Sequence, residues 1–128
     1  MTVADPLPSS AILQELRSFG ELGTVLLIAA HPDDENTRLI AYFARERGYR
    51  IAYLSLTRGD GGQNLLGSEL GQALGAIRTQ ELLAARRVDG GEQFFTRAID
   101  FGFSKSADET LRIWDRQAVL GDIVRIIR

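Results

Sequence analysis

The feature that most constrains the fold is a repeated alternation of short apolar runs with segments of helical periodicity. Apolar runs of strand length occupy residues 24–30, 50–57 and 93–99, whereas residues 36–47, 73–88 and 116–128 space their apolar side chains as helices do. Strands that alternate with helices form parallel sheets with helices packed against them. The order therefore predicts an α/β fold with a mostly parallel sheet, and the uniformly apolar first run predicts a strand covered on both faces.

The chain has 128 residues, a length that suits one domain. A further helix is predicted near residues 9–20, with Ser9 or Ser10 as its cap and Gly20 as its end. We divide the chain into an amino-terminal helix and linker, residues 1–22, and a core, residues 23–128.

Composition excludes several classes of function. The net charge of −2 provides no basic field, so neither a nucleic acid nor an anionic membrane is an expected partner. There is no cysteine, which excludes disulfides and thiolate chemistry. No apolar run reaches the length of a membrane span, and the start "MTVADPLPSS" has no signal-peptide pattern. The sequence thus indicates a soluble protein and leaves its compartment open, either cytoplasmic or, if a signal has been removed, secreted.

The stretch "AHPDDEN", at residues 30–36, places the only histidine beside three acids directly after the first predicted strand. Ligands of parallel α/β sheets bind beyond the carboxyl ends of the strands, which is where this stretch lies. One interpretation is structural, with Asp33 or Asp34 capping the helix that begins near Asn36. The other is a divalent metal site, with His31 and Asp34 as mixed nitrogen and oxygen ligands suited to zinc or another first-row metal. Asp33 would then be free to accept a proton.

Several stretches together resemble a known family. "AHPDDE" after an apolar strand resembles the signature of the LmbE-like (PIG-L) zinc-dependent N-deacetylases, and the likeness continues in "LTRGDGG", "RTQELLAA" and "AIDFGF", over about residues 24–128. The resemblance implies a Rossmann-like three-layer sandwich, Zn²⁺ held by His31 and Asp34, and Asp33 as general base. The implied reaction removes the N-acetyl group of an N-acetylglucosaminyl conjugate, a small-molecule amino sugar, and releases acetate. Glu35 is expected to start the helix or to orient His31.

The resemblance also implies something that this chain lacks. Zinc hydrolases usually have three protein ligands, and the family takes its third from a histidine after a fourth strand. Because the chain has no second histidine, we expect it to be the amino-terminal part of a longer domain, ending before that strand. The chain alone is then expected to be nearly inactive and to self-associate through an unpaired strand edge.

Three further residues are candidate substrate contacts. Arg58, after the second strand, is either a solvated loop charge or a residue that binds sugar hydroxyls or shapes the glycine-rich segment; Asp60 is equally ambiguous. Arg78 is either a surface partner of Glu81 or a pocket arginine, as the resemblance favours. Asp100, after the third strand, resembles a substrate-contacting acid.

Other interpretations stay open at this point. Trp114 and the pair Phe94–Phe95 are assigned to the core or to a partner-facing surface rather than to a sugar platform. The glycine-rich segment at residues 59–75 matches neither dinucleotide nor P-loop spacing. The main alternative to an enzyme is a non-catalytic carbohydrate- or metal-binding module, and a second is a Rossmann-like domain that binds a nucleotide or a protein.

Overall fold

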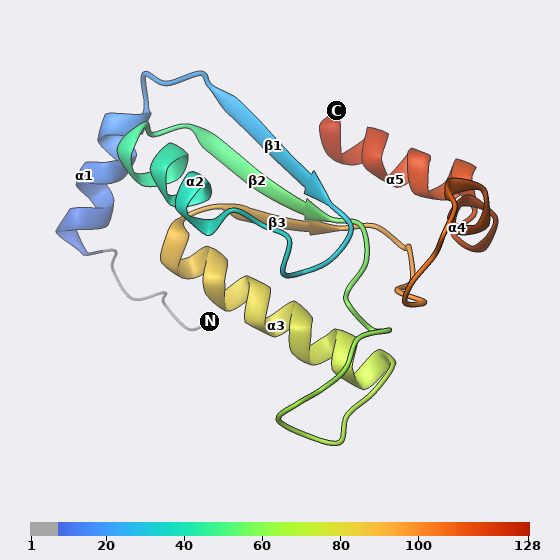
Figure 1. The fold of residues 1–128 in the computed structure, drawn as a ribbon. Coiled ribbons are helices and arrows are strands. Elements are labelled where there is room, and N and C mark those ends of the chain that lie inside the picture. Colours follow the sequence, from blue (N-terminus) through green and yellow to red (C-terminus); the bar gives the residue numbers. More distant parts are fainter. Residues whose placement is uncertain (1–7) are drawn as a thin grey trace, which may run out of the picture.

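The computed structural model describes residues 8–128, which form one parallel sheet with helices around it (Figure 1). The strands are β1 (Thr24–Ala29), β2 (Arg50–Ser55) and β3 (Glu92–Phe95). The helices are α1 (Ser9–Ser18), α2 (Thr37–Ala41), α3 (Gln72–Asp89), α4 (Ala107–Ile113) and α5 (Arg116–Ile127), and a π-helical turn, η1 (Tyr42–Glu46), continues α2. The predicted α/β fold is confirmed.

The sheet has the order β1-β2-β3, and both pairs of strands are parallel. All six residues of β1 pair with β2, from Thr24 opposite Arg50 to Ala29 opposite Ser55. Because the strands run in one direction, their carboxyl ends lie at one edge of the sheet, on the right in Figure 1. The segments that follow the three strands therefore meet at this edge.

One face of the sheet carries the core and is covered by α2, η1 and α3 (Figure 1). Its centre consists of the buried residues Ile40, Ile51, Tyr53 and Leu82. Six partly buried residues pack around them, namely Val25, Leu27, Ala29, Phe43, Ala44 and Phe95. Alternate residues of β1 and β2 supply this face, as the period of two along a strand requires.

The opposite face is covered only in part, by α5. A cavity of about 400 Å³ lies between this face and the end of α5, with Leu26, Phe94 and Ile127 in its lining. Ile28 remains 49% exposed, so the expectation that β1 is covered on both faces is wrong for this chain. Within residues 8–128, β1 pairs with β2 alone, and its other edge is open. Self-association through that edge stays a prediction.

Three local predictions differ from the structure. The cap of α1 is Pro8 rather than a serine. The predicted third strand ends at Phe95, because the backbone N–H groups that follow donate to side chains: that of Arg97 to Asp122 and that of Asp100 to Asp60. Between the predicted third strand and the last predicted helix, where no element was predicted, the structure contains α4, which Ser106 caps by accepting a hydrogen bond from the Glu109 N–H. None of the helices in residues 8–128 has the length and apolar character needed to cross a membrane.

A buried acid attaches α5 to the exit of β3. Asp122 accepts hydrogen bonds from the Arg97 backbone N–H at 3.1 Å and from both sides of the Arg97 guanidinium at 2.8 Å. Arg125, one turn further along α5, lies 3.1 Å from the same carboxylate. The Arg97 guanidinium, with the Arg97 N–H and Arg125, holds the pKa of Asp122 well below its usual range. The pairing therefore stabilises the ionised carboxylate in the folded state.

This attachment predicts a pH-dependent effect on stability. Because the folded-state pKa of Asp122 is depressed, its contribution is present above the unfolded pKa of about 3.9 and is lost as pH falls below it. We expect Asp122→Asn to lower the midpoint of thermal unfolding at neutral pH, and the difference from the parent chain to shrink steadily below about pH 4. Circular dichroism melts across this range measure it, with Asp108→Asn, an exposed acid on α4, as the control. A difference that does not change with pH would contradict the assignment.

Candidate active site

His31 and Asp34 are brought together by a tight turn at the exit of β1. The Asp34 carboxylate accepts a hydrogen bond from the His31 backbone N–H at 3.0 Å, and its Oδ2 lies 3.3 Å from His31 Nδ1. Both side chains are about half exposed. Pro32 between them is buried, which holds the turn against the protein. The imidazole and the carboxylate therefore face the same small volume at the carboxyl edge of the sheet.

The structural interpretation of the two aspartates is wrong. The cap of α2 is Asn36, whose side chain accepts a hydrogen bond from the Leu39 N–H at 3.0 Å. The Asp34 carboxylate accepts a hydrogen bond from the His31 backbone N–H, and Asp33 pairs with Arg78 on α3. Neither aspartate is needed to begin α2.

Tyr53, a buried core residue of β2, contacts the backbone of His31. Its hydroxyl donates a hydrogen bond to the His31 carbonyl oxygen. Burial, assisted by the nearby charges of Glu35 and Asp34, raises the pKa of Tyr53 to about 12. The hydroxyl thus keeps its proton across the physiological pH range and remains a donor. The histidine backbone is positioned by a rigid core residue of the neighbouring strand.

Asp100 reaches the other nitrogen of His31. Its Oδ1 lies 3.9 Å from His31 Nε2, and its side chain is largely buried. Its backbone N–H donates to Asp60 at 3.1 Å, so the segments after β2 and β3 are joined. A Cβ atom added to Gly61 would overlap the Asp100 carbonyl oxygen, which explains why a glycine lies at this contact.

Asp33 and Arg78 form the other side of the site. Arg78 lies 3.5 Å from Asp33 and 3.8 Å from Glu81, its neighbour on α3. The two interpretations of Arg78 are therefore compatible, since it contacts Glu81 and also lies in the site. Asp33 is 73% exposed and free to contact a ligand.

These residues surround a cleft of about 410 Å³, a size that suits a small molecule. Its lining consists of His31, Pro32, Asp33, Asp34, Gly59, Gly62, Gln63, Arg78 and Asp100. Five of the six predicted site residues thus line one cleft. Arg58 does not: it donates to Thr79 on α3 at 2.9 Å, and its guanidinium lies over the Phe95 ring. These contacts favour shaping of the glycine-rich segment over a direct contact with a ligand.

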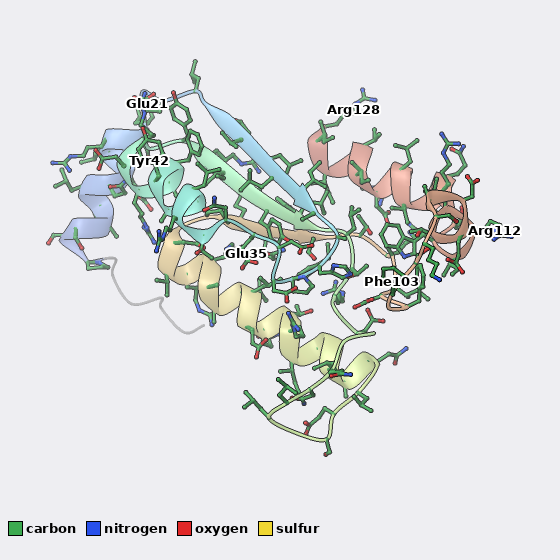
Figure 2. All side chains as sticks on the ribbon, viewed as in Figure 1. Glu21, Glu35, Tyr42, Phe103, Arg112 and Arg128 are labelled. Atoms are coloured by element: carbon green, nitrogen blue, oxygen red, sulfur yellow. The ribbon has the colours of Figure 1, made fainter. Side chains whose placement is uncertain are left out.

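Sequence reasoning missed a buried ionic network behind the cleft. Arg86 is 4% exposed and holds Asp89 at 2.7 Å and Glu35 at 3.4 Å. It also donates to Gln93 at 3.2 Å. Figure 2 shows Glu35 in the region between α2 and α3. Glu35 thus anchors the turn to α3 and does not orient His31. The signal available in the sequence, an arginine and an aspartate three residues apart on a helix, is too common to identify such a network.

The acids of the motif are therefore separated by their partners. Asp34 pairs with His31, Asp33 with Arg78, and Glu35 with Arg86. Their charge density alone does not require an ion. Two ligands of a tetrahedral zinc ion, each about 2.0–2.1 Å from it, lie about 3.3 Å apart. His31 Nδ1 and Asp34 Oδ2 have this separation, so this pair fits two positions of such an ion.

A third donor is not assembled with this pair. Within residues 8–128, no group of three histidine, cysteine, aspartate or glutamate side chains is arranged to hold a metal. The described residues thus provide two donors at this spacing and no third one beside them.

The chain belongs to the PIG-L family, described as GlcNAc-PI de-N-acetylase, whose model matches residues 26–128. None of the curated proteins compared with the chain matches it significantly.

Two solved structures share the fold. One is GalB, the 4-carboxy-2-hydroxymuconate hydratase from Pseudomonas putida KT2440, with a TM-score of 0.57 and 24% identity over 76% of this chain and 44% of that one. The other is N,N'-diacetylchitobiose deacetylase from Pyrococcus horikoshii, with a TM-score of 0.51 and 22% identity over 80% of this chain and 41% of that one. The chain therefore spans less than half the length of either protein. The fold is that of the LmbE-like proteins.

The buried network predicts a large loss of stability when its cation is removed. Arg86→Met leaves Glu35 and Asp89 buried without their partner, so we expect a loss of about 3–5 kcal/mol in the free energy of unfolding. Urea denaturation measures the loss. The matched control is Arg87→Met, at the next position on α3, where the arginine is exposed and the expected change is within about 0.5 kcal/mol. Equal effects at the two positions would show that the network contributes little.

Proposed function

We propose that this chain carries part of a metal-dependent deacetylase site that hydrolyses the N-acetyl group of an N-acetylglucosaminyl conjugate. The observation that carries the proposal is the pairing of the sole histidine with Asp34 at zinc-ligand spacing, with Asp33 exposed beside it in the same cleft. Membership of a family described as a de-N-acetylase supports the reaction class. The fold alone would not, because one similar structure is a hydratase and the other a deacetylase.

In this proposal, His31 and Asp34 hold the ion, which is Zn²⁺ or another first-row divalent metal. Such an ion supplies Lewis acidity, polarising the amide carbonyl and making water a better nucleophile near neutral pH. Tyr53 and the Asp34 hydrogen bond to the His31 N–H keep the two donors in place. Positioning of this kind lowers the cost of bringing the groups to their reacting geometry.

Asp33 is the proposed general base. It accepts a proton from the water whose oxygen attacks the acetamide carbon. The C–N bond then breaks, the nitrogen takes up a proton, and the products are acetate and the free amino sugar. Arg78, at 3.5 Å, limits the positions that the exposed Asp33 carboxylate adopts.

Arg78 and Asp100 are the proposed substrate contacts, because both line the cleft beside His31. An arginine fork donates to sugar or conjugate oxygens, and a carboxylate accepts from sugar hydroxyls. Arg58 is proposed to act on the substrate only indirectly, through the segment that it holds against α3.

We further propose that these 128 residues turn over substrate slowly at best. Two donors bind zinc more weakly than the three that zinc hydrolases usually have. The alternative function, a non-catalytic carbohydrate- or metal-binding module, is consistent with the same two donors, His31 and Asp34.

Metal titration tests the role of each residue. We expect the chain to bind Zn²⁺ in isothermal titration calorimetry, and His31→Ala to weaken binding by at least about tenfold because it removes one of two donors. Asp33→Ala should retain most of the affinity, since the proposed base is not a ligand. Equal weakening by both variants would assign Asp33 to the ligand set.

Acetate release is the second readout. Where the parent protein hydrolyses an N-acetylglucosaminyl compound, Asp33→Ala should abolish the release of acetate and retain the affinity for zinc. Full activity of Asp33→Ala would disprove its role as base. Zinc binding with no acetate release by the parent protein would favour the module.

A further inference from the structure

A second cavity adjoins the candidate active site. Its volume is about 480 Å³, and it shares His31, Gly62 and Asp100 with the cleft described above. It extends away from these residues toward α4, where Ile99, Phe101, Phe103 and Trp114 form its wall. Trp114 is only partly buried here, so of the two predicted positions, the core and a partner-facing surface, it does not occupy the core. The two cavities thus join at the His31–Asp100 pair.

The aromatic wall of this cavity is held in place. The Trp114 indole N–H donates to the Ile99 carbonyl oxygen at 2.8 Å, and the Phe101 ring meets Trp114 edge-to-face with centroids 6.4 Å apart. Phe103, by contrast, is 86% exposed, and Figure 2 shows it on the segment that leads into α4. A phenylalanine this exposed beside a cavity has apolar surface available for a ligand.

The polar side chains of the wall are already occupied. The Ser104 hydroxyl contacts Glu109 at 2.7 Å and the Ser106 carbonyl at 3.0 Å, and the Thr110 hydroxyl contacts the same carbonyl at 3.4 Å. Apart from His31 and Asp100, no ionisable side chain lines this cavity in the described part of the chain. A ligand there meets apolar surface, and Asp100 at the junction disfavours an anion.

We propose that this cavity binds an uncharged aromatic or alkyl group attached to the amino sugar, so that the substrate is an apolar conjugate rather than a phosphate-linked one. The inference rests on the proposed function, because it places the acetamide at His31 and Asp34. The apolar group then extends along Phe103 and Trp114 while the sugar spans the junction. Its recognition depends on apolar burial and on ring stacking, both of which the wall provides.

The chain contains its own reporter of this binding, because Trp114 is its only tryptophan. Phenyl N-acetyl-β-glucosaminide, added to the 128-residue chain, should change the Trp114 emission saturably. Methyl N-acetyl-β-glucosaminide, measured by calorimetry on the same protein, should bind at least about fivefold more weakly because it lacks the ring. Phe103→Ala should weaken the phenyl ligand by about fivefold and leave the methyl ligand unchanged.

Phe19→Ala is the matched control. Phe19 is 90% exposed at the end of α1 and is not part of the cavity, so its loss should leave both affinities unchanged. The proposal is overturned if the phenyl ligand gives no saturable change, if phenyl and methyl ligands bind equally, or if Phe103→Ala binds as the parent chain does.

Phenyl β-glucoside separates this proposal from the deacetylase assignment. If the glucoside binds as tightly as phenyl N-acetyl-β-glucosaminide and its binding depends equally on Phe103, the apolar site is supported and specificity for the N-acetyl group is contradicted. If the acetamido compound binds more tightly, both stand.

Discussion

The structure depends on the parallel pairing of β1 with β2, which continues past the ends of both strands. The Leu56 N–H donates to Ala29 at 2.8 Å and the Thr57 N–H to Ala30 at 3.0 Å, and the Tyr53 hydroxyl then binds the His31 carbonyl. The pairing thus determines where the first acidic turn begins. Since the His31 carbonyl oxygen is bound by Tyr53 and the residues just before it pair with the segment after β2, the side chains of His31 and Asp34 extend from a fixed backbone. The glycine-rich segment follows β2 and lies against Asp100 at Asp60 and Gly61.

Arginines organise the charge around this turn. Three acids in succession would repel one another, but they point in different directions and each meets a different group. Asp34 turns back on His31, Asp33 reaches Arg78 at the surface of the cleft, and Glu35 enters the interior to meet Arg86. The three acids of this short motif therefore have three different partners. One acid faces the imidazole, one is exposed in the cleft beside Arg78, and one attaches the turn to α3.

Much of the fold could be predicted because its signal is local. Apolar periodicity identified the three strands and the helices between them, and the carboxyl-edge rule placed the motif correctly. The prediction failed where a distant side chain replaced a local partner. The third strand stops at Phe95, and beyond it the Arg97 and Asp100 N–H groups donate to Asp122 and Asp60 instead of to a neighbouring strand. β1 is less covered than its composition suggests because α5 contacts only part of that face. Among the predicted site residues, Arg58 alone lies outside the cleft, because its guanidinium contacts Thr79 on α3 and the Phe95 ring.

The sequence by itself determined the parallel α/β architecture, the position of the acidic turn at the end of the first strand, and the residue types able to bind a metal or move a proton. These follow from periodicity and from adjacency along the chain, which act over a few residues. Only the tertiary structure decided that Glu35 is buried against Arg86, that Asp100 approaches His31 across three strands, and that Trp114 lines a cavity beside the site. The contacts of these residues with Arg86, His31 and Ile99 join positions 51, 69 and 15 apart, and their geometry depends on how strands and helices pack rather than on any local pattern.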